Sequence, residues 1–198
     1  MRLDRVVMLL AAASMAGAPP PAPPQHYVFF NRDRARIHDD AFLATPAIAG
    51  AQLKYTWKEL EPKRDAYAFA PVLAALAFLE AHHKRLVIQL QDATFDERLN
   101  VPDYLREDSS FHGGAARKYQ AESAHDTLAR FAGWVARRWD PSVQARFAKL
   151  LQALGGQVGR RIEALVLSET AVEFGGSERN QPAGFTFEAY VAGVQAQM

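Results

Sequence analysis

Residues Ile162–Thr170 have the sequence IEALVLSET, and this segment is the clearest indication of the fold class. A short and nearly continuous apolar run of this kind is typical of a buried parallel strand. Glu169 stands at the end of the run, so the sequence places a carboxylate at the carboxyl end of a strand. These strand ends form the active face of α/β barrels, and Glu169 is therefore a candidate catalytic residue. The alternative is a structural role, in which Glu169 caps the following loop.

The composition is that of a globular protein with a packed core. The chain has 198 residues, of which 49% are hydrophobic, and a formal net charge of +1. This balance lacks the basic surplus of nucleic-acid-binding proteins, so we expect a neutral partner and no nucleic acid. The absence of cysteine excludes disulfides, thiolate metal sites and thiol nucleophiles. The histidines show no spacing that places two ligands on one face, so we expect neither a metal nor another cofactor.

The N-terminus has the layout of a secretory signal peptide. Arg2 and Arg5 precede the apolar run 6–13, and the small residues 16–18 follow it. We expect residues 1–18 to be the signal peptide and residues 19–25 a proline-rich spacer. The protein would then be secreted or periplasmic, with no membrane contact after cleavage. An uncleaved N-terminal anchor is the alternative, because Pro19 directly follows the cleavage site.

From residue 26 onward, strand and helix patterns alternate, which favours βαβ units and a parallel sheet. The patterns predict strands over 26–30, 49–57, 85–91 and 162–169, and helices over 39–43, from Pro71 to about Leu79, 123–138, 141–154 and 187–198. The second-last helix should begin after Asp140 as N-cap and stop at Gly155. The long connection after the third strand should form a wall of a binding site. Four βα units are half of an eight-stranded barrel, so we expect residues 26–198 to form an incomplete (β/α)8 TIM barrel.

Three segments resemble clan A glycoside hydrolases, especially the family 42 and family 35-like β-galactosidases. Trp57-Lys58-Glu59-Leu60-Glu61-Pro62, followed by Tyr67-Ala68-Phe69, is similar to the W-x-x-L-E-P…Y-D-F segment after the second strand of that clan. Leu86–Gln91 and then Val101-Pro102-Asp103-Tyr104 resemble its third strand and the loop that follows. Ser168-Glu169 lies where the clan has Asn-Glu. The resemblance covers residues 27–173 in the right order.

This resemblance implies a retaining glycosidase that acts on a carbohydrate, with Glu169 as general acid/base. Hydrolysis with retention of the anomeric configuration requires two carboxyl groups about 5–5.5 Å apart. The resemblance implies that the nucleophile comes from a seventh strand, and we find no such strand in this sequence. Two positions depart from the pattern: Ser168 replaces asparagine, and Lys54 is the cation on the second strand where the clan has arginine. The alternatives are therefore a carbohydrate-binding barrel without catalysis, or a half-barrel that associates with itself through open sheet edges.

Five further residues are candidates for substrate binding, and four of them have a structural alternative. Trp57 could stack on a sugar ring or pack between strand and helix. Gln89 and Gln91 lie on one face of their strand, and could bind hydroxyl groups or form an internal polar network. Asp92 could bind substrate or satisfy its own backbone. Ser168 occupies the position that contacts the sugar in the clan, whereas Glu61 with Pro62 is expected to be a structural turn pair.

Export gives a direct test of the N-terminal assignment. If a signal peptide is cleaved, protein isolated from the periplasm or medium should begin between Gly17 and Gln25. N-terminal sequencing measures this. Soluble cytoplasmic protein that retains Met1 would contradict the assignment.

Overall fold

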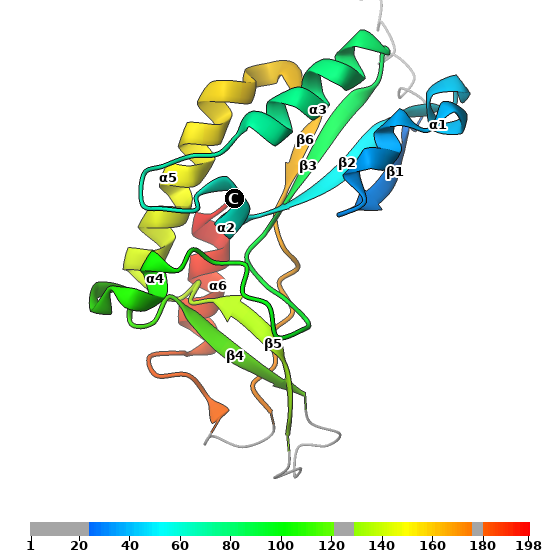
Figure 1. Cartoon of the computed structure of the whole chain (residues 1–198). Helices are drawn as coiled ribbons and strands as arrows, with labels where there is room; N and C mark the ends of the chain where they lie inside the picture. Colours follow the sequence, from blue (N-terminus) through cyan, green and yellow to red (C-terminus); the bar gives the residue numbers. More distant parts are fainter. Residues whose placement is uncertain (1–23, 121–128, 176–179) are drawn as a thin grey trace, which may run out of the picture.

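The computed structural model describes residues 24–120, 129–175 and 180–198, and it contains a parallel sheet of four strands (Figure 1). The strands are β1 (His26–Asn31), β2 (Ile48–Thr56), β3 (Arg85–Gln91) and β6 (Ala164–Val166), in the order β1-β2-β3-β6. Each parallel strand is therefore added at the same edge as the chain proceeds, as in a barrel. This arrangement confirms the expected α/β class. The predicted signal peptide and most of the predicted spacer lie outside the described residues.

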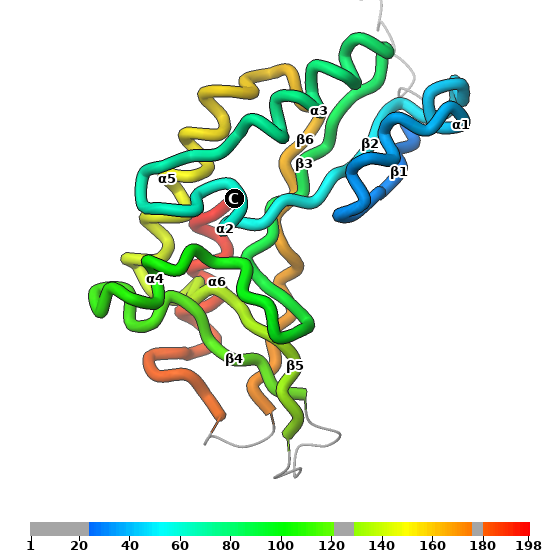
Figure 2. The backbone as a smooth tube through the Cα atoms, viewed as in Figure 1, coloured from blue at the N-terminus to red at the C-terminus, as the bar shows by residue number. Residues whose placement is uncertain are grey.

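Helices connect the strands and follow the last one. They are η1 (Arg34–His38), α1 (Asp40–Ala44), α2 (Trp57–Leu60), α3 (Ala70–Ala81), α4 (Tyr104–Glu107), η2 (Ser109–Phe111), α5 (Pro141–Val158), η3 (Gly159–Arg161) and α6 (Phe187–Ala196). The tube view shows α3 and α5 side by side along one face of the sheet (Figure 2). Within the described residues, none of the helices combines the length and the hydrophobicity that a membrane-spanning segment needs.

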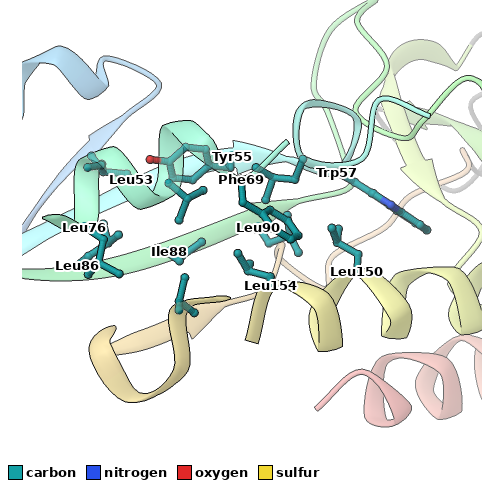
Figure 3. Packing of buried hydrophobic residues seen from close by; sticks show 14 of the residues in the cluster. Leu53, Tyr55, Trp57, Phe69, Leu76, Leu86, Ile88, Leu90, Leu150 and Leu154 are labelled. Atoms are coloured by element: carbon teal, nitrogen blue, oxygen red, sulfur yellow. The ribbon is translucent and has the colours of Figure 1, made fainter. Parts of the chain in front are cut away.

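The main core lies between this face of the sheet and helices α3 and α5. On this face, every second residue of β2 and β3 points toward the helices and is almost completely buried (Figure 3). They are Leu53, Tyr55, Leu86, Ile88 and Leu90, and they pack with Leu76, Leu150 and Leu154 in one apolar cluster. The opposite face carries polar residues, since the strand register pairs Lys54 with Gln89 and Thr56 with Gln91.

Helix α5 begins as predicted and ends later. The carboxylate of Asp140 accepts a hydrogen bond from the Ser142 amide at 2.8 Å, and Pro141 occupies the first turn. The predicted stop at Gly155 is wrong, because the helix continues to Val158 and ends at Gly159, whose φ is 54°. Val158 is 1% exposed, and burial of this side chain offsets the low helix propensity of the glycines in the last turns.

The predicted helix over 123–138 is wrong where the structure describes it. Residues Arg130–Ala136 form strand β5, which pairs antiparallel with β4 (Ala115–Gln120); residues 121–128 lie outside the described residues. Phe131 and Val135 fit a helical stripe, but the segment also contains Gly133 and several aromatic and β-branched residues that suit a strand. The hairpin replaces part of the long connection that we expected after β3.

The β4–β5 hairpin packs against the chain as it leaves β3. The Thr94 amide donates to the Trp134 carbonyl at 2.8 Å, and the Ala136 amide donates to the Asp92 carbonyl at 3.1 Å. Gly133 allows this close approach, because a Cβ at its position would lie 2.1 Å from the Thr94 carbonyl oxygen. Its φ of 106° also disfavours any other residue.

Two strand ends differ from the prediction. β6 ends at Val166, so Leu167, Ser168 and Glu169 follow it as irregular backbone. Trp57 begins α2 instead of ending β2, because Thr56 and Glu59 form a reciprocal capping box there.

Gly133 and Gly113 form a matched pair for a stability test. Both have a positive φ, but only Gly133 has neighbours within 4 Å of a built Cβ. We expect Gly113→Ala to lower the free energy of unfolding by about 1–2 kcal/mol through backbone strain alone. Gly133→Ala should lower it by a further ~1–3 kcal/mol, because the methyl group collides with Thr94. Chemical denaturation followed by circular dichroism measures both, and equal losses would contradict the close contact.

Candidate active site

Glu169 lies at the carboxyl end of the sheet, three residues beyond β6, and its side chain is exposed. Two lysines interact electrostatically with its carboxylate: Lys54 from β2 and Lys118 from β4. The structure thus brings together a cation predicted from sequence, a second cation from the hairpin, and the predicted catalytic carboxylate. This end of the sheet is where a parallel α/β fold presents its functional groups.

Arg138 fixes the backbone of Glu169. Its guanidinium donates to the Glu169 carbonyl oxygen at 2.9 Å and to the Tyr190 hydroxyl at 2.8 Å. The Tyr190 hydroxyl in turn donates to the Thr170 carbonyl oxygen at 2.5 Å. Two side chains from different parts of the chain therefore hold the irregular segment after β6 in place.

Asp92 anchors Arg138 through a bidentate ion pair. The two oxygens of Asp92 accept from Arg138 Nη2 at 2.6 Å and Nε at 2.9 Å, and both side chains are 2% exposed. Such forked geometry gives arginine–carboxylate pairs their specificity. Asp92 therefore binds a buried partner. This role is neither the predicted contact with substrate nor the alternative, in which the Asp92 carboxylate would bond to its own backbone.

Ser168 joins the ends of β3 and β6. Its hydroxyl oxygen accepts from the Asp92 amide at 2.9 Å, and its hydroxyl donates to the Leu90 carbonyl at 3.2 Å. The residue is 7% exposed. These bonds give Ser168 a structural role at the position that we predicted to contact substrate.

Gln89 and Gln91 lie on the sheet face that points away from the helices, as predicted from the strand period. Gln91 is buried and Gln89 half-buried, and their side-chain oxygens have no hydrogen-bond partner among the described residues. Both oxygens are buried, so neither is open to a ligand in this structure, and the choice between the two roles stays a prediction.

Trp57 lies in the core, where its ring cannot stack on a ligand. It is completely buried, packs edge-on against Phe147 and donates from Nε1 to Glu61 at 2.9 Å. The structure therefore supports the packing alternative. Glu61 is equally buried and forms an ion pair with Arg146 of α5, in agreement with its expected structural role.

Three residues of this site were missed from sequence: Lys118, Arg138 and Tyr190. From sequence, Arg138 is expected at the end of a helix and Lys118 in the long connection after the third strand. Residues 115–120 read Ala-Ala-Arg-Lys-Tyr-Gln and show no regular alternation of polar and apolar residues, so no local pattern identified Lys118 as an inward residue of a strand. Arg138 and Tyr190 meet across 52 residues, and no local pattern predicts that contact.

Burial changes the proton affinities around Glu169. Desolvation lowers the pKa of the Lys118 ammonium, and the negative charge of Glu169 acts in the opposite direction. Desolvation lowers the pKa of Lys54 in the same way, with Arg32 adding to the effect. Burial raises the pKa of the Tyr190 hydroxyl, so this group stays a hydrogen-bond donor at neutral pH. No group of three His, Asp or Glu side chains suited to a metal ion occurs within the described ranges.

Solved structures of glycoside hydrolases have a similar fold. GH5_18 from Bifidobacterium longum subsp. longum matches with a TM-score of 0.55 at 10% identity, over 87% of this chain and 40% of that one. A variant of the same enzyme in complex with Manβ1-4GlcNAc matches with a TM-score of 0.50 at 10% identity, over 88% and 41%. GH5_18 from Streptomyces cattleya in complex with GlcNAc matches with a TM-score of 0.50 at 14% identity, over 89% and 41%.

These matches establish the fold class. The sheet and its helices correspond to part of a glycoside hydrolase TIM barrel, and the chain spans about two fifths of the length of these structures. No family model matches the chain, and no curated protein matches it. The resemblance to families 42 and 35 in particular stays a prediction.

The Asp92–Arg138 pair gives a stability prediction. Asp92→Asn leaves the guanidinium buried without its counter-charge, so the free energy of unfolding should fall by about 3–5 kcal/mol. The matched control is Glu80→Gln, which removes an exposed ion pair with Arg161 and should cost about 0–1 kcal/mol. Urea denaturation of both variants measures the difference. Similar losses in the two variants would show that the buried pair does not organise the site.

Proposed function

We propose that this chain forms the acid/base part of a retaining glycoside hydrolase, in which Glu169 protonates the leaving oxygen and later activates water. The position of Glu169 carries the proposal. It is an exposed carboxylate at the carboxyl end of the fourth parallel strand, on backbone that Arg138 and Tyr190 hold in place. A carboxyl group fixed in this way can transfer a proton in both directions at one site.

The sugar ligands of the similar structures support a carbohydrate substrate. Two of those structures contain Manβ1-4GlcNAc or GlcNAc, bound to proteins whose fold this chain shares in part. We further propose that the nucleophile carboxylate belongs to a strand beyond the four of this sheet, and that the protein is exported.

A self-associating half-barrel is the second candidate. β1 and β6 each pair with one neighbour in the described sheet, so each has an open edge that can pair with another strand. In that case the 198-residue chain should form a dimer or larger species by size-exclusion chromatography with light scattering. A monomer would rule out this candidate and leave the enzymatic proposal in place.

Glu169→Gln tests the catalytic role in a protein that combines this chain with the strand that we propose to carry the nucleophile. The amide keeps the shape of the side chain but removes its proton, so turnover of substrates with poor leaving groups should fall by about 10²–10⁴-fold. An aryl glycoside with a good leaving group should still form the glycosyl-enzyme. Added azide, which needs no general base, should then restore its turnover as the glycosyl azide.

The matched control is Glu163→Gln, which changes an exposed glutamate just before β6 that forms an ion pair with Arg85. It should leave turnover within about twofold, because Glu163 lies at the opposite end of the strand from Glu169. Unchanged turnover of natural substrates in Glu169→Gln would disprove the assignment. The 198-residue chain alone should release no nitrophenol from aryl glycosides.

A further inference from the structure

A hollow of about 410 Å³ lies between the β4–β5 hairpin and the segment that follows Glu169. Its volume is within the range of small-molecule binding sites. Lys118, Gln120 and Ala132 line it from the hairpin, and Val172 and Glu173 from the opposite wall. Phe95 completes the lining, and its ring is 69% exposed.

Lys118 is an unusual residue for the wall of such a hollow. Its side chain is 4% exposed, and its ammonium lies 3.8 Å from the centroid of the Phe95 ring. No carbonyl or carboxylate oxygen among the described residues accepts a hydrogen bond from this ammonium. An anion in the hollow would accept a charge-assisted hydrogen bond from this ammonium.

Among the described residues, the cations around Glu169 outnumber the carboxylates that they face. Lys54 and Lys118 both interact with this one carboxylate, and Arg32 adds a third cation beside Lys54. Asp92 is neutralised by Arg138, and Asp96 by Arg98. Glu173 borders the hollow on the wall opposite Lys118, so an anion is favoured at the Lys118 end.

We propose that this hollow binds a sugar unit that carries a negative charge, with Lys118 pairing with the charged group and Phe95 packing against the sugar ring. The exposed face of Phe95 can contact the C–H groups of a pyranose. The inference rests on the proposed function, because it places the hollow beside the reacting bond. It replaces the neutral partner that the overall charge of +1 led us to expect, since the local charge near Glu169 differs from the net charge.

Binding to the 198-residue chain tests the proposal without requiring catalysis. Isothermal titration calorimetry would compare methyl β-D-glucuronide with methyl β-D-glucoside, which differ at carbon 6. The glucuronide should bind at least about tenfold more tightly, and the difference should shrink as salt is added. Methyl β-D-galactoside 6-sulfate and inorganic sulfate complete the set. Tighter binding of the sulfated sugar than of the glucuronide would assign a sulfate ester as the charged group.

Substitutions test which residues cause the preference for the charged sugar. Lys118→Met keeps the length and apolar stem of the buried side chain, and should abolish the preference for the charged sugar. Lys58→Met should preserve it, because Lys58 pairs with Asp103 on the surface. Phe95→Ala changes an exposed residue and should weaken binding of the charged and neutral sugars alike. If Lys118→Met does not fold, the salt dependence of the unchanged chain still decides the question.

Equal binding of the glucuronide and the glucoside would overturn the proposal, as would binding of inorganic sulfate alone or no binding of any probe. Glu169→Gln separates this inference from the proposed function, because it should retain the charged-sugar preference. If the glucuronide is still preferred but Glu169→Gln does not change turnover, only the catalytic role is refuted. If the neutral sugar is preferred and turnover depends on Glu169, only the charged-sugar site is refuted.

Discussion

The buried ion pair between Asp92 and Arg138 is the interaction on which the candidate site depends. It ties the end of β3 to the chain that leaves β5, and the same guanidinium reaches Glu169 and Tyr190. Removal of both charges from water is costly, and the forked geometry with further hydrogen bonds offsets that cost. One residue thus joins the sheet, the hairpin, helix α6 and the segment that carries the proposed catalytic carboxylate.

The two faces of the sheet have different chemistry because one of them packs against helices. Apolar residues of β2 and β3 meet α3 and α5, whereas the paired residues Lys54 and Gln89 lie on the other face. A polar layer on that face suits contact with water, with a sugar or with further polar strands. It is a poor surface for a large apolar partner.

Sequence predicted the parts of the fold that depend on local patterns. The bounds of β3 and the start of α5 agree with the structure, because a continuous apolar strand and an Asp-Pro cap are local signals. The hairpin was missed because Phe131 and Val135 fit both a helical and a strand period. Of the site, Glu169 and Lys54 were identified by their places on strands. The buried roles of Asp92 and Ser168 depend on partners 46 and 76 residues away, which no local pattern encodes.

The short pairing of β6 has a consequence for the mobility of the carboxylate. β6 aligns with only three residues of β3, whereas β2 aligns with seven. Few ladder hydrogen bonds therefore protect β6, and local opening there costs less free energy than opening between β2 and β3. Glu169 follows the strand with the fewest paired residues in the described sheet. The hydrogen bonds from Arg138 and Tyr190 to the backbone of Glu169 and Thr170 therefore supply order that the short strand pairing does not.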